Sequence, residues 1–171
     1  MLRFDTPLIS SFWQSACADL GIPCDSHHCA CTFAEPRNPV RIQAIDALSE
    51  LALSGQKRGT AHLEMQFRED NIPMREIGDY WIVLKCDGTP MCVVRIIAIE
   101  IVPFNQVGPE FAASEGEGDL SRRYWREAHG AYFQAQCDRW GVTWRDDLLV
   151  VCENFLTVYR PGNSAMTKRQ S

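Results

Sequence analysis

The stretch YWIVLKCDGTPMCVVRIIAIEIV, residues 80–102, decides the fold class. Its two ends, 80–85 and 91–102, are rich in β-branched and aromatic residues, which favour strands. Asp87-Gly88 between them has the composition of a tight hairpin turn. The stretch therefore predicts two antiparallel strands joined by a short loop.

Further strands are predicted on either side of this hairpin. Residues 61–68 alternate between apolar and polar side chains, beginning with Ala61 and Leu63, as expected of a strand with one buried face. Residues 148–159 form a mostly apolar run with several β-branched side chains, which predicts a final strand.

Helices are indicated by apolar residues that recur three or four positions apart and by capping residues at the segment ends. Asn38 and Pro39 suit the start of the second helix, and Gly55 suits its end. Asp119 is the expected N-cap of the longest helix. The predicted helices cover residues 7–20, 41–54, 109–114 and the segment from Asp119 to residue 140.

The order of these elements limits the architecture. Two helices, a strand, a hairpin, two helices and a strand lack the regular alternation of strand and helix that parallel sheets require. We expect an α+β fold, with a small, mostly antiparallel sheet or β-barrel and flanking helices.

The composition is that of an ordinary globular protein. The 171 residues suffice for one domain, and 46% hydrophobic with 23% charged residues exclude a disordered chain or a collagen-like repeat. The formal net charge of −5 provides no overall positive field for long nucleic acid. Any contact with nucleic acid must therefore be local.

The sequence predicts no contact with a membrane. The longest apolar run, 91–104, is interrupted by Arg95 and Glu100, and the first residues lack the apolar core of a signal peptide. We expect a cytoplasmic protein, and nothing in the sequence indicates its oligomeric state.

Eight cysteines raise the question of disulfides or a metal. We expect them to be reduced and mostly buried, because a chain of this size can build its core without disulfides in a reducing compartment. The segment CDSHHCAC, residues 24–31, holds the ligand types that zinc prefers, on Cys24, His27, His28, Cys29 and Cys31. Its spacing differs from the recurrent Cys-x-x-Cys pattern, and the alternation from His28 onward suits a strand. We expect no metal and no cofactor.

Several motifs together resemble the ASCH domain family, in particular its stand-alone bacterial proteins of this length. In chain order they are GQKRGT (55–60), IGDYWIVL (77–84), VPF (102–104), FA (111–112), EGEGD (115–119), YWREAH (124–129) and VCENF (151–155). The resemblance covers residues 41–159, and Phe12-Trp13 extends it to the first helix.

The resemblance implies a specific fold and division of the chain. The fold would be a small, mostly antiparallel β-barrel similar to the PUA domain, with helices closing its ends. Residues 1–40 would be a helix and loop packed on the domain, 41–160 the ASCH domain itself, and 161–171 a mobile tail.

The resemblance also implies a range of functions. The family is generally proposed to bind RNA in a cleft beside the motif that follows the second helix. One branch removes the acetyl group from N(4)-acetylcytidine, another member is described as a ribonuclease, and many members have no assigned activity.

The chain departs from the family signature Gly-x-Lys-x-x-Glu-x-Arg. Gly55 and Lys57 match it, but Thr60 stands at the place of the Glu and His62 at the place of the Arg. The amidohydrolase branch carries Lys, Thr three residues later, and a Glu near the later acidic run. Lys57, Thr60 and Glu115 fit that pattern, which implies catalytic roles for these three residues.

Amide hydrolysis needs a nucleophile, a proton acceptor and positive charge near the developing oxyanion. Thr60 would supply the hydroxyl nucleophile, and Glu115 would hold Lys57 or carry a proton to the leaving amine. Lys57 acts as a base only if burial or a neighbouring cation lowers its pKa. The structural alternative is a lysine at a helix end that contacts solvent and a threonine chosen for the strand.

Other side chains are candidates for contact with the ligand. Arginine and aromatic groups grip phosphates and stack on bases, and a carboxylate can accept a hydrogen bond from the exocyclic amine of a base. The alternative for the helix that follows residue 119 is an ordinary amphipathic helix with solvated arginines and a buried tryptophan. The candidates are Gly55, Arg58, His62, Glu117, Arg122, Trp125 and Arg126.

These inferences predict a protein that binds RNA or a modified nucleoside, with hydrolysis of an acylated cytidine amide as the preferred activity. One alternative is a ribonuclease acting on single-stranded RNA, with Lys57 stabilising a phosphate. The other is a non-catalytic RNA-binding or regulatory module.

Overall fold

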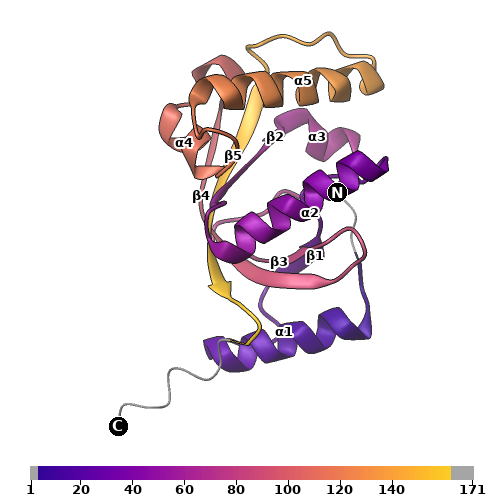
Figure 1. Cartoon of the computed structure of the whole chain (residues 1–171), viewed down its shortest axis with the longest axis vertical. Helices are drawn as coiled ribbons and strands as arrows, with labels where there is room; N and C mark the ends of the chain where they lie inside the picture. The colour runs from indigo at the N-terminus through magenta and orange to yellow at the C-terminus, as the bar shows by residue number, and fades with distance from the viewer. Residues whose placement is uncertain (1–3, 163–171) are drawn as a thin grey trace. The chain divides into compact units, whose positions relative to one another are not determined.

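The computed structural model describes residues 4–162 (Figure 1). The helices are α1 (Pro7–Leu20), α2 (Pro39–Ser54), α3 (Glu64–Glu69), the single 3-10 turn η1 (Phe104–Gln106), α4 (Pro109–Ser114) and α5 (Arg122–Trp140). The strands are β1 (His28–Cys31), β2 (Gly59–Leu63), β3 (Tyr80–Leu84), β4 (Pro90–Pro103) and β5 (Leu149–Tyr159). The predicted hairpin, final strand and helices at the start of the chain are confirmed.

The strands form one mixed five-stranded sheet in the order β1-β3-β4-β5-β2. β1 pairs with β3 in parallel, whereas β3 with β4 and β2 with β5 are antiparallel. Within residues 4–162, β1 and β2 are the edge strands and no pairing joins them. The α+β class is confirmed, but the expectation of a closed β-barrel is wrong for this sheet.

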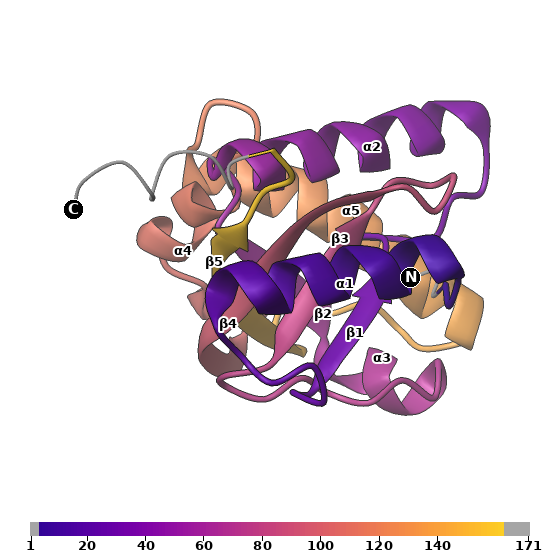
Figure 2. The ribbon, with the colours of Figure 1, turned by 90° about the horizontal axis from the view of Figure 1, so that it is seen from below.

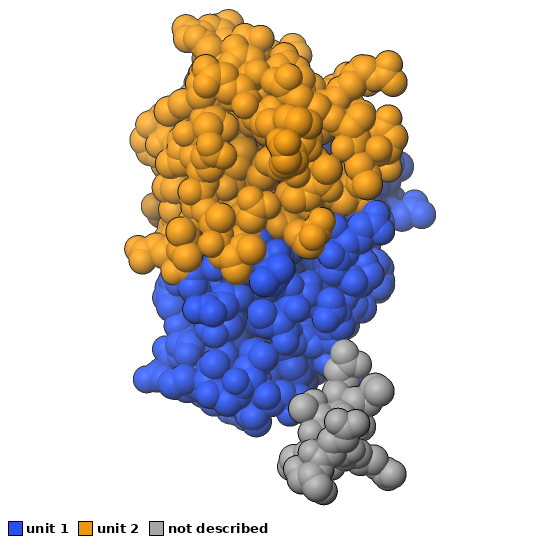
Figure 3. Space-filling model, turned by 90° about the vertical axis from the view of Figure 1, so that its left-hand side faces the viewer, with its two compact units in different colours: residues 1–56, 78–96, 155–171 blue, residues 57–77, 97–154 orange. Residues whose placement is uncertain are grey.

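The chain divides into two compact units (Figure 3). Of the described residues, 4–56, 78–96 and 155–162 belong to unit 1, and 57–77 with 97–154 belong to unit 2. Both β4 and β5 contribute residues to each unit. Of the tail predicted as residues 161–171, residues 163–171 lie outside the described part of the chain.

Unit 1 is built around the hairpin and α1, which passes in front of β1 in Figure 2. Its core joins Trp13 and Ala16 of α1 to Ile82 and Leu84 of β3 and to Val93 of β4. Thr6 caps the start of α1, and Gly21 ends it in the left-handed conformation.

Unit 2 buries one face of the β2–β5 pair. Ala61 lies opposite Cys152 and Leu63 opposite Val150 in the antiparallel register. These four side chains share a core with α5 and the segment 104–112. The α5 contribution to this core is Trp125, Phe133 and Cys137.

The segment 61–68 is not one strand. β2 ends at Leu63, and α3 begins at Glu64. Gln66 and Phe67 are both buried, which an alternating strand with one buried face does not allow. Strong helix formers, with Glu64 in the first turn and Arg68 in the last, explain why this short helix forms.

The start of α5 also differs from the prediction. Ser121, not Asp119, is the N-cap, because its hydroxyl accepts a hydrogen bond from the Tyr124 backbone N–H at 3.1 Å. Asp119 instead accepts from the backbone N–H of Ser121 at 2.9 Å. Leu120 between them has a φ of 63°, which is not a helical value, so the helix cannot begin at Asp119.

The cysteines are free thiols, as expected. Five are buried, Cys24 is exposed, and the other two are half-buried. Among residues 4–162, no helix is long and apolar enough to cross a membrane.

We predict that Phe133→Ala lowers the free energy of unfolding by about 3–5 kcal/mol, because it leaves a cavity where a fully buried ring now packs. Chemical denaturation measures this change. The control is Leu149→Ala, whose side chain is 46% exposed and should change stability by no more than about 0.5 kcal/mol. Equal losses for the two variants would contradict the assigned core.

Candidate functional site

The Lys57 side chain is an ammonium group buried against two carboxylates. Its Nζ donates to Glu115 Oε2 at 2.5 Å and to Glu117 Oε1 at 2.7 Å. The exposed fractions of the side chains are 1% for Lys57, 2% for Glu115 and 25% for Glu117. Glu117 therefore connects this buried cluster to solvent.

The turn after α4 explains why both carboxylates reach the same ammonium. Gly116 and Gly118 adopt positive φ values of 74° and 57°, which glycine does without steric cost. A Cβ at Gly118 would also lie 2.5 Å from the Tyr124 ring, which would have to move to accommodate it. The tight turn directs Glu115 and Glu117 towards Lys57.

The segment that carries Lys57 is hydrogen-bonded to the end of α4. The Arg58 backbone N–H donates to Ser114 O at 2.7 Å. Asn154 of β5 donates from Nδ2 to Ser114 Oγ at 2.9 Å and to Arg58 O at 3.3 Å. A Cβ at Gly59 would lie 2.4 Å from Ser114 Oγ, so the close approach of these segments depends on this glycine. These contacts fix Lys57 relative to the 115–117 turn.

The second oxygen of Glu115 is held by α5. Trp125 Nε1 donates to Glu115 Oε1 at 3.1 Å, and His129 Nε2 lies 3.1 Å from the same oxygen. The His129 ring stacks on Trp125 with centroids 4.4 Å apart, and its side chain is 14% exposed. Both oxygens of the Glu115 carboxylate are thus occupied.

The charges decide the protonation states of this cluster. Burial alone would lower the pKa of Lys57, but the charges and hydrogen bonds of Glu115 and Glu117 outweigh it and raise that pKa above its ordinary value. Burial alone would raise the pKa of Glu115, but Lys57 and His129 lower it far below its ordinary value. The lowered lysine pKa that a resting base requires is therefore not found. Lys57 is an ammonium ion and Glu115 a carboxylate.

Thr60 lies on the opposite face of β2 from the α5 core. Successive residues of a strand face opposite sides, so Thr60 and His62 share a face that excludes Ala61. In the β2–β5 register, Thr60 is directly opposite Glu153. No interaction joins Thr60 to Lys57 or Glu115 among residues 4–162, although all three are buried in unit 2.

A second buried polar cluster occupies that face. Arg75 donates from Nε to Glu153 Oε2 at 2.8 Å, and its guanidinium also lies 3.3 Å from His62 Nε2. Burial, followed by the charge of Arg75, lowers the pKa of His62 to about 3. His62 is therefore neutral at physiological pH, and its Nε2 accepts a hydrogen bond from Arg75. His62, at the place of the signature arginine, thus lies beside the guanidinium of Arg75.

The other predicted ligand contacts are dispersed. Gly55 ends α2 in the left-handed conformation, and the Arg58 side chain is exposed. Arg122 donates to the backbone oxygens of residues 107 and 105 at 2.7 and 2.6 Å. Arg126 lies over the Phe104 ring, 5.3 Å from its centroid. Trp125 is buried, so its ring has no exposed face for a base.

Two residues of these clusters, Glu153 and Arg75, were given no role from the sequence. Glu153 could have been noticed as a charge inside an apolar strand. Arg75 had no such signal, because it lies in the irregular segment between α3 and β3. Its role depends on contacts with residues 13 and 78 positions away.

The Cys- and His-rich segment is used for packing. His28 stacks on Trp13 at 4.2 Å, and His27 Nδ1 lies 2.8 Å from Asp79 Oδ1. Over the described part of the chain, no group of three His, Cys, Asp or Glu side chains is arranged to hold a metal ion.

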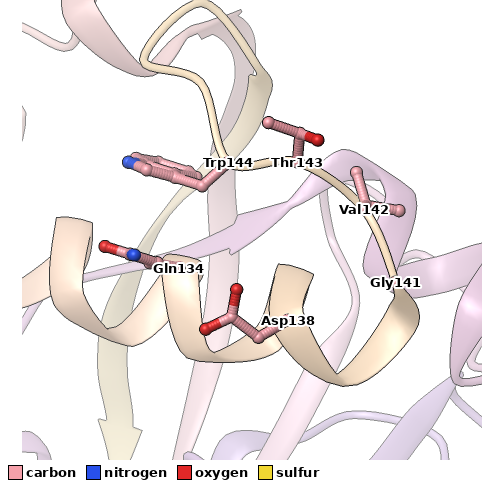
Figure 4. Close-up of a pocket in the computed structure, with 6 residues that line it drawn as sticks. All are labelled: Gln134, Asp138, Gly141, Val142, Thr143 and Trp144. Carbon is pink, nitrogen blue, oxygen red and sulfur yellow. The ribbon is translucent and has the colours of Figure 1, made fainter.

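A surface hollow of about 460 Å³ lies where α5 meets the following loop (Figure 4). Its walls are Gln134, Asp138, Gly141, Val142, Thr143 and Trp144. None of the predicted site residues lines it, so it is separate from the Lys57 cluster.

Comparisons with known proteins give a consistent assignment. A family model described as the ASCH domain matches residues 37–159. The structure is similar to that of an ASCH domain from Lactobacillus crispatus, with a TM-score of 0.75 and 30% sequence identity over 88% of this chain and 94% of that one. A protein from Enterococcus faecalis has a TM-score of 0.75 at 24% identity, over 90% of this chain and 94% of that one, which shows a shared fold. No curated protein sequence matches the chain.

We predict that Glu115→Gln destabilises the protein by about 3–5 kcal/mol near neutral pH, because it removes one of the two charges that compensate a buried ammonium ion. Because the pKa of Glu115 is lowered by folding, its stabilising effect is complete above the ordinary value of 4.5 and is lost as the pH falls below it. As the pH falls below 4.5, the free energy of unfolding should therefore decrease less for the variant than for the wild type.

Urea denaturation at a series of pH values tests this prediction. The matched control is Glu127→Gln on the exposed side of α5, which should follow the wild-type curve. An unchanged free energy of unfolding for Glu115→Gln at neutral pH would contradict a buried ion pair.

We predict that the His62 ring does not titrate in the folded protein between about pH 8 and about pH 5, because its folded pKa is lowered to about 3. The unfolded chain binds a proton in this range, so His62 decreases stability as the pH falls below its ordinary pKa of 6.5. Proton NMR of the imidazole C–H resonances over a pH series measures this directly. A His62 midpoint near 6.5 would show that the ring is not buried beside Arg75.

Proposed function

Because the chain belongs to the ASCH domain family, we propose that it binds RNA or a modified nucleoside beside Lys57 and hydrolyses the amide bond of an N(4)-acylated cytidine. The observation that carries this proposal is the buried Lys57 ammonium group, held by Glu115 and by the partly exposed Glu117. Such a preorganised charge is worth far more to a developing oxyanion than a solvated lysine.

The charge of the cluster favours an amide over a phosphate. One ammonium and two carboxylates sum to a net charge of −1. A phosphodiester would meet this negative charge, whereas the carbonyl oxygen of an amide is neutral until it is attacked. The Glu117 carboxylate can also accept a hydrogen bond from an N–H group of a base. The cluster therefore supports amide hydrolysis better than the ribonuclease alternative.

In this proposal Lys57 stabilises charge and does not act as the resting base. The substrate carbonyl oxygen replaces Glu117 on the ammonium group, because Glu117 is the only one of the two carboxylates with substantial exposure. Thr60 supplies the attacking hydroxyl. Glu115, held by Trp125 and His129, keeps Lys57 charged and in place.

We predict that the purified protein releases cytidine and the free acid from N(4)-acetylcytidine without added RNA or metal. Lys57→Ala and Thr60→Val should each lower kcat/KM by at least about 100-fold, the loss typical of removing an oxyanion donor or a nucleophile. Lys85→Ala is the matched lysine control, since Lys85 pairs with Glu50 on the surface of unit 1. Chromatography of a panel of acylated nucleosides measures all four proteins.

Two outcomes would contradict the proposed hydrolysis. Degradation of single-stranded RNA without conversion of any acylated nucleoside would indicate a ribonuclease. A shift of labelled RNA that weakens with salt and leaves the RNA intact would indicate a binding module.

A further inference from the structure

The carboxylate of Glu153 is fully buried, and only one of its oxygens is occupied. Arg75 holds Oε2 through Nε and through a second guanidinium nitrogen at 2.7 Å. Oε1 has no hydrogen-bond partner, although Glu153 is 0% exposed. An unpartnered buried carboxylate oxygen is costly, so its retention calls for an explanation.

The β2–β5 register places Thr60 directly beside this carboxylate. Cross-strand partners in an antiparallel pair have their Cβ atoms about 4.5–5.5 Å apart and their side chains on the same face. A threonine hydroxyl and a glutamate carboxylate at that separation are within reach of each other after a rotation about their side-chain bonds. The acceptor beside the Thr60 hydroxyl is therefore Glu153.

Arg75 places a positive charge beside Glu153 and holds one of its two oxygens. Arg75 is 8% exposed and provides the positive charge that a buried carboxylate requires. His62, neutral and in contact with Arg75, adds no competing cation. Arg75 thus holds Oε2 in place and leaves Oε1 without a donor.

Two other titratable groups of the proposed site, Lys57 and Glu115, are poorly suited to accept a proton. Lys57 is an ammonium ion and has no lone pair to offer. Both oxygens of Glu115 already accept hydrogen bonds, from Lys57 on one side and from Trp125 and His129 on the other. Glu153 is the carboxylate with an unoccupied oxygen next to the nucleophile.

We propose that Glu153 accepts the proton of the Thr60 hydroxyl when that oxygen attacks an acyl carbonyl, which makes Glu153 a further catalytic residue. This inference rests on the proposed function. The Thr60 Oγ–carbon bond forms as the carbonyl π pair moves to the oxygen beside Lys57, and the hydroxyl proton passes to Glu153 Oε1. When the carbon–nitrogen bond breaks, that proton goes to the departing amine.

Water completes the cycle with the same groups. It attacks the threonine ester and gives a proton to Glu153, which returns it to Thr60 Oγ as the ester bond breaks. The sum is an amide and water converted into an acid and an amine, and no other reactant is needed.

The test uses p-nitrophenyl acetate, an activated ester that acylates a nucleophile without requiring a nucleoside site. We expect the wild-type chain to gain one acetyl group on Thr60, located by peptide mass spectrometry after acid quenching. Glu153→Gln should lower the acylation rate by about 100-fold or more, within the usual contribution of a general base.

Loss of structure is controlled separately. Glu153→Gln leaves Arg75 buried without a counter-ion, so the double variant Glu153→Gln with Arg75→Met removes both charges and should fold, as circular dichroism and thermal unfolding would show. It should acylate as slowly as Glu153→Gln. Glu100→Gln on an exposed position of β4 is the matched carboxylate control and should react at the wild-type rate.

The outcomes separate this inference from the proposed function. Wild-type rates of Thr60 acylation in folded Glu153 variants would overturn the inference while leaving acylcytidine hydrolysis possible. Acylation of Thr60 that requires Glu153, in a protein that converts no acylated nucleoside, would support the inference and reject the proposed substrate. Acetyl groups found elsewhere but not on Thr60 would overturn the inference.

Discussion

The arrangement of unit 2 depends on compensating one buried ammonium ion. A lysine that is 1% exposed would lose its charge or disrupt the fold unless carboxylates lie within hydrogen-bond distance. Glu115 and Glu117 meet this requirement from a turn built on two glycines with positive φ. The contacts of Glu115 with Trp125 and His129 then join the turn to α5. The same carboxylate therefore compensates the charge of Lys57 and connects the turn to the helix.

The two faces of β2 contact different clusters, one apolar and one polar. Ala61 and Leu63 enter the apolar core with β5 and α5, whereas Thr60 and His62 face Glu153 and Arg75. Packing holds the strand in register, and the register sets Thr60 opposite Glu153. A shift by one residue would exchange the two faces, placing charged groups in the core and apolar groups in the polar cluster.

Both clusters contain paired charges, but they differ in which atoms remain available. Both oxygens of the Glu115 carboxylate accept hydrogen bonds, so this group holds and orients the Lys57 side chain. Glu153 keeps one oxygen without a partner, and Glu117 reaches solvent. These differences support the proposal that Lys57 and Thr60 take part in acyl transfer together with the open oxygen of Glu153.

The sequence alone determined the local structure: the hairpin around Asp87-Gly88, the helix ends at Gly21 and Gly55, and the kinship carried by motifs such as EGEGD. These features depend on neighbouring residues, whose periodicity and capping chemistry can be read directly. The sequence also indicated Lys57, Thr60 and Glu115 as candidate catalytic residues, but only because they match a pattern of the family. Only the tertiary structure decided that the sheet is open, that Lys57 is charged, and that Arg75 meets Glu153. Strand pairing and the electrostatic environment of a buried side chain both depend on residues that are distant in the chain.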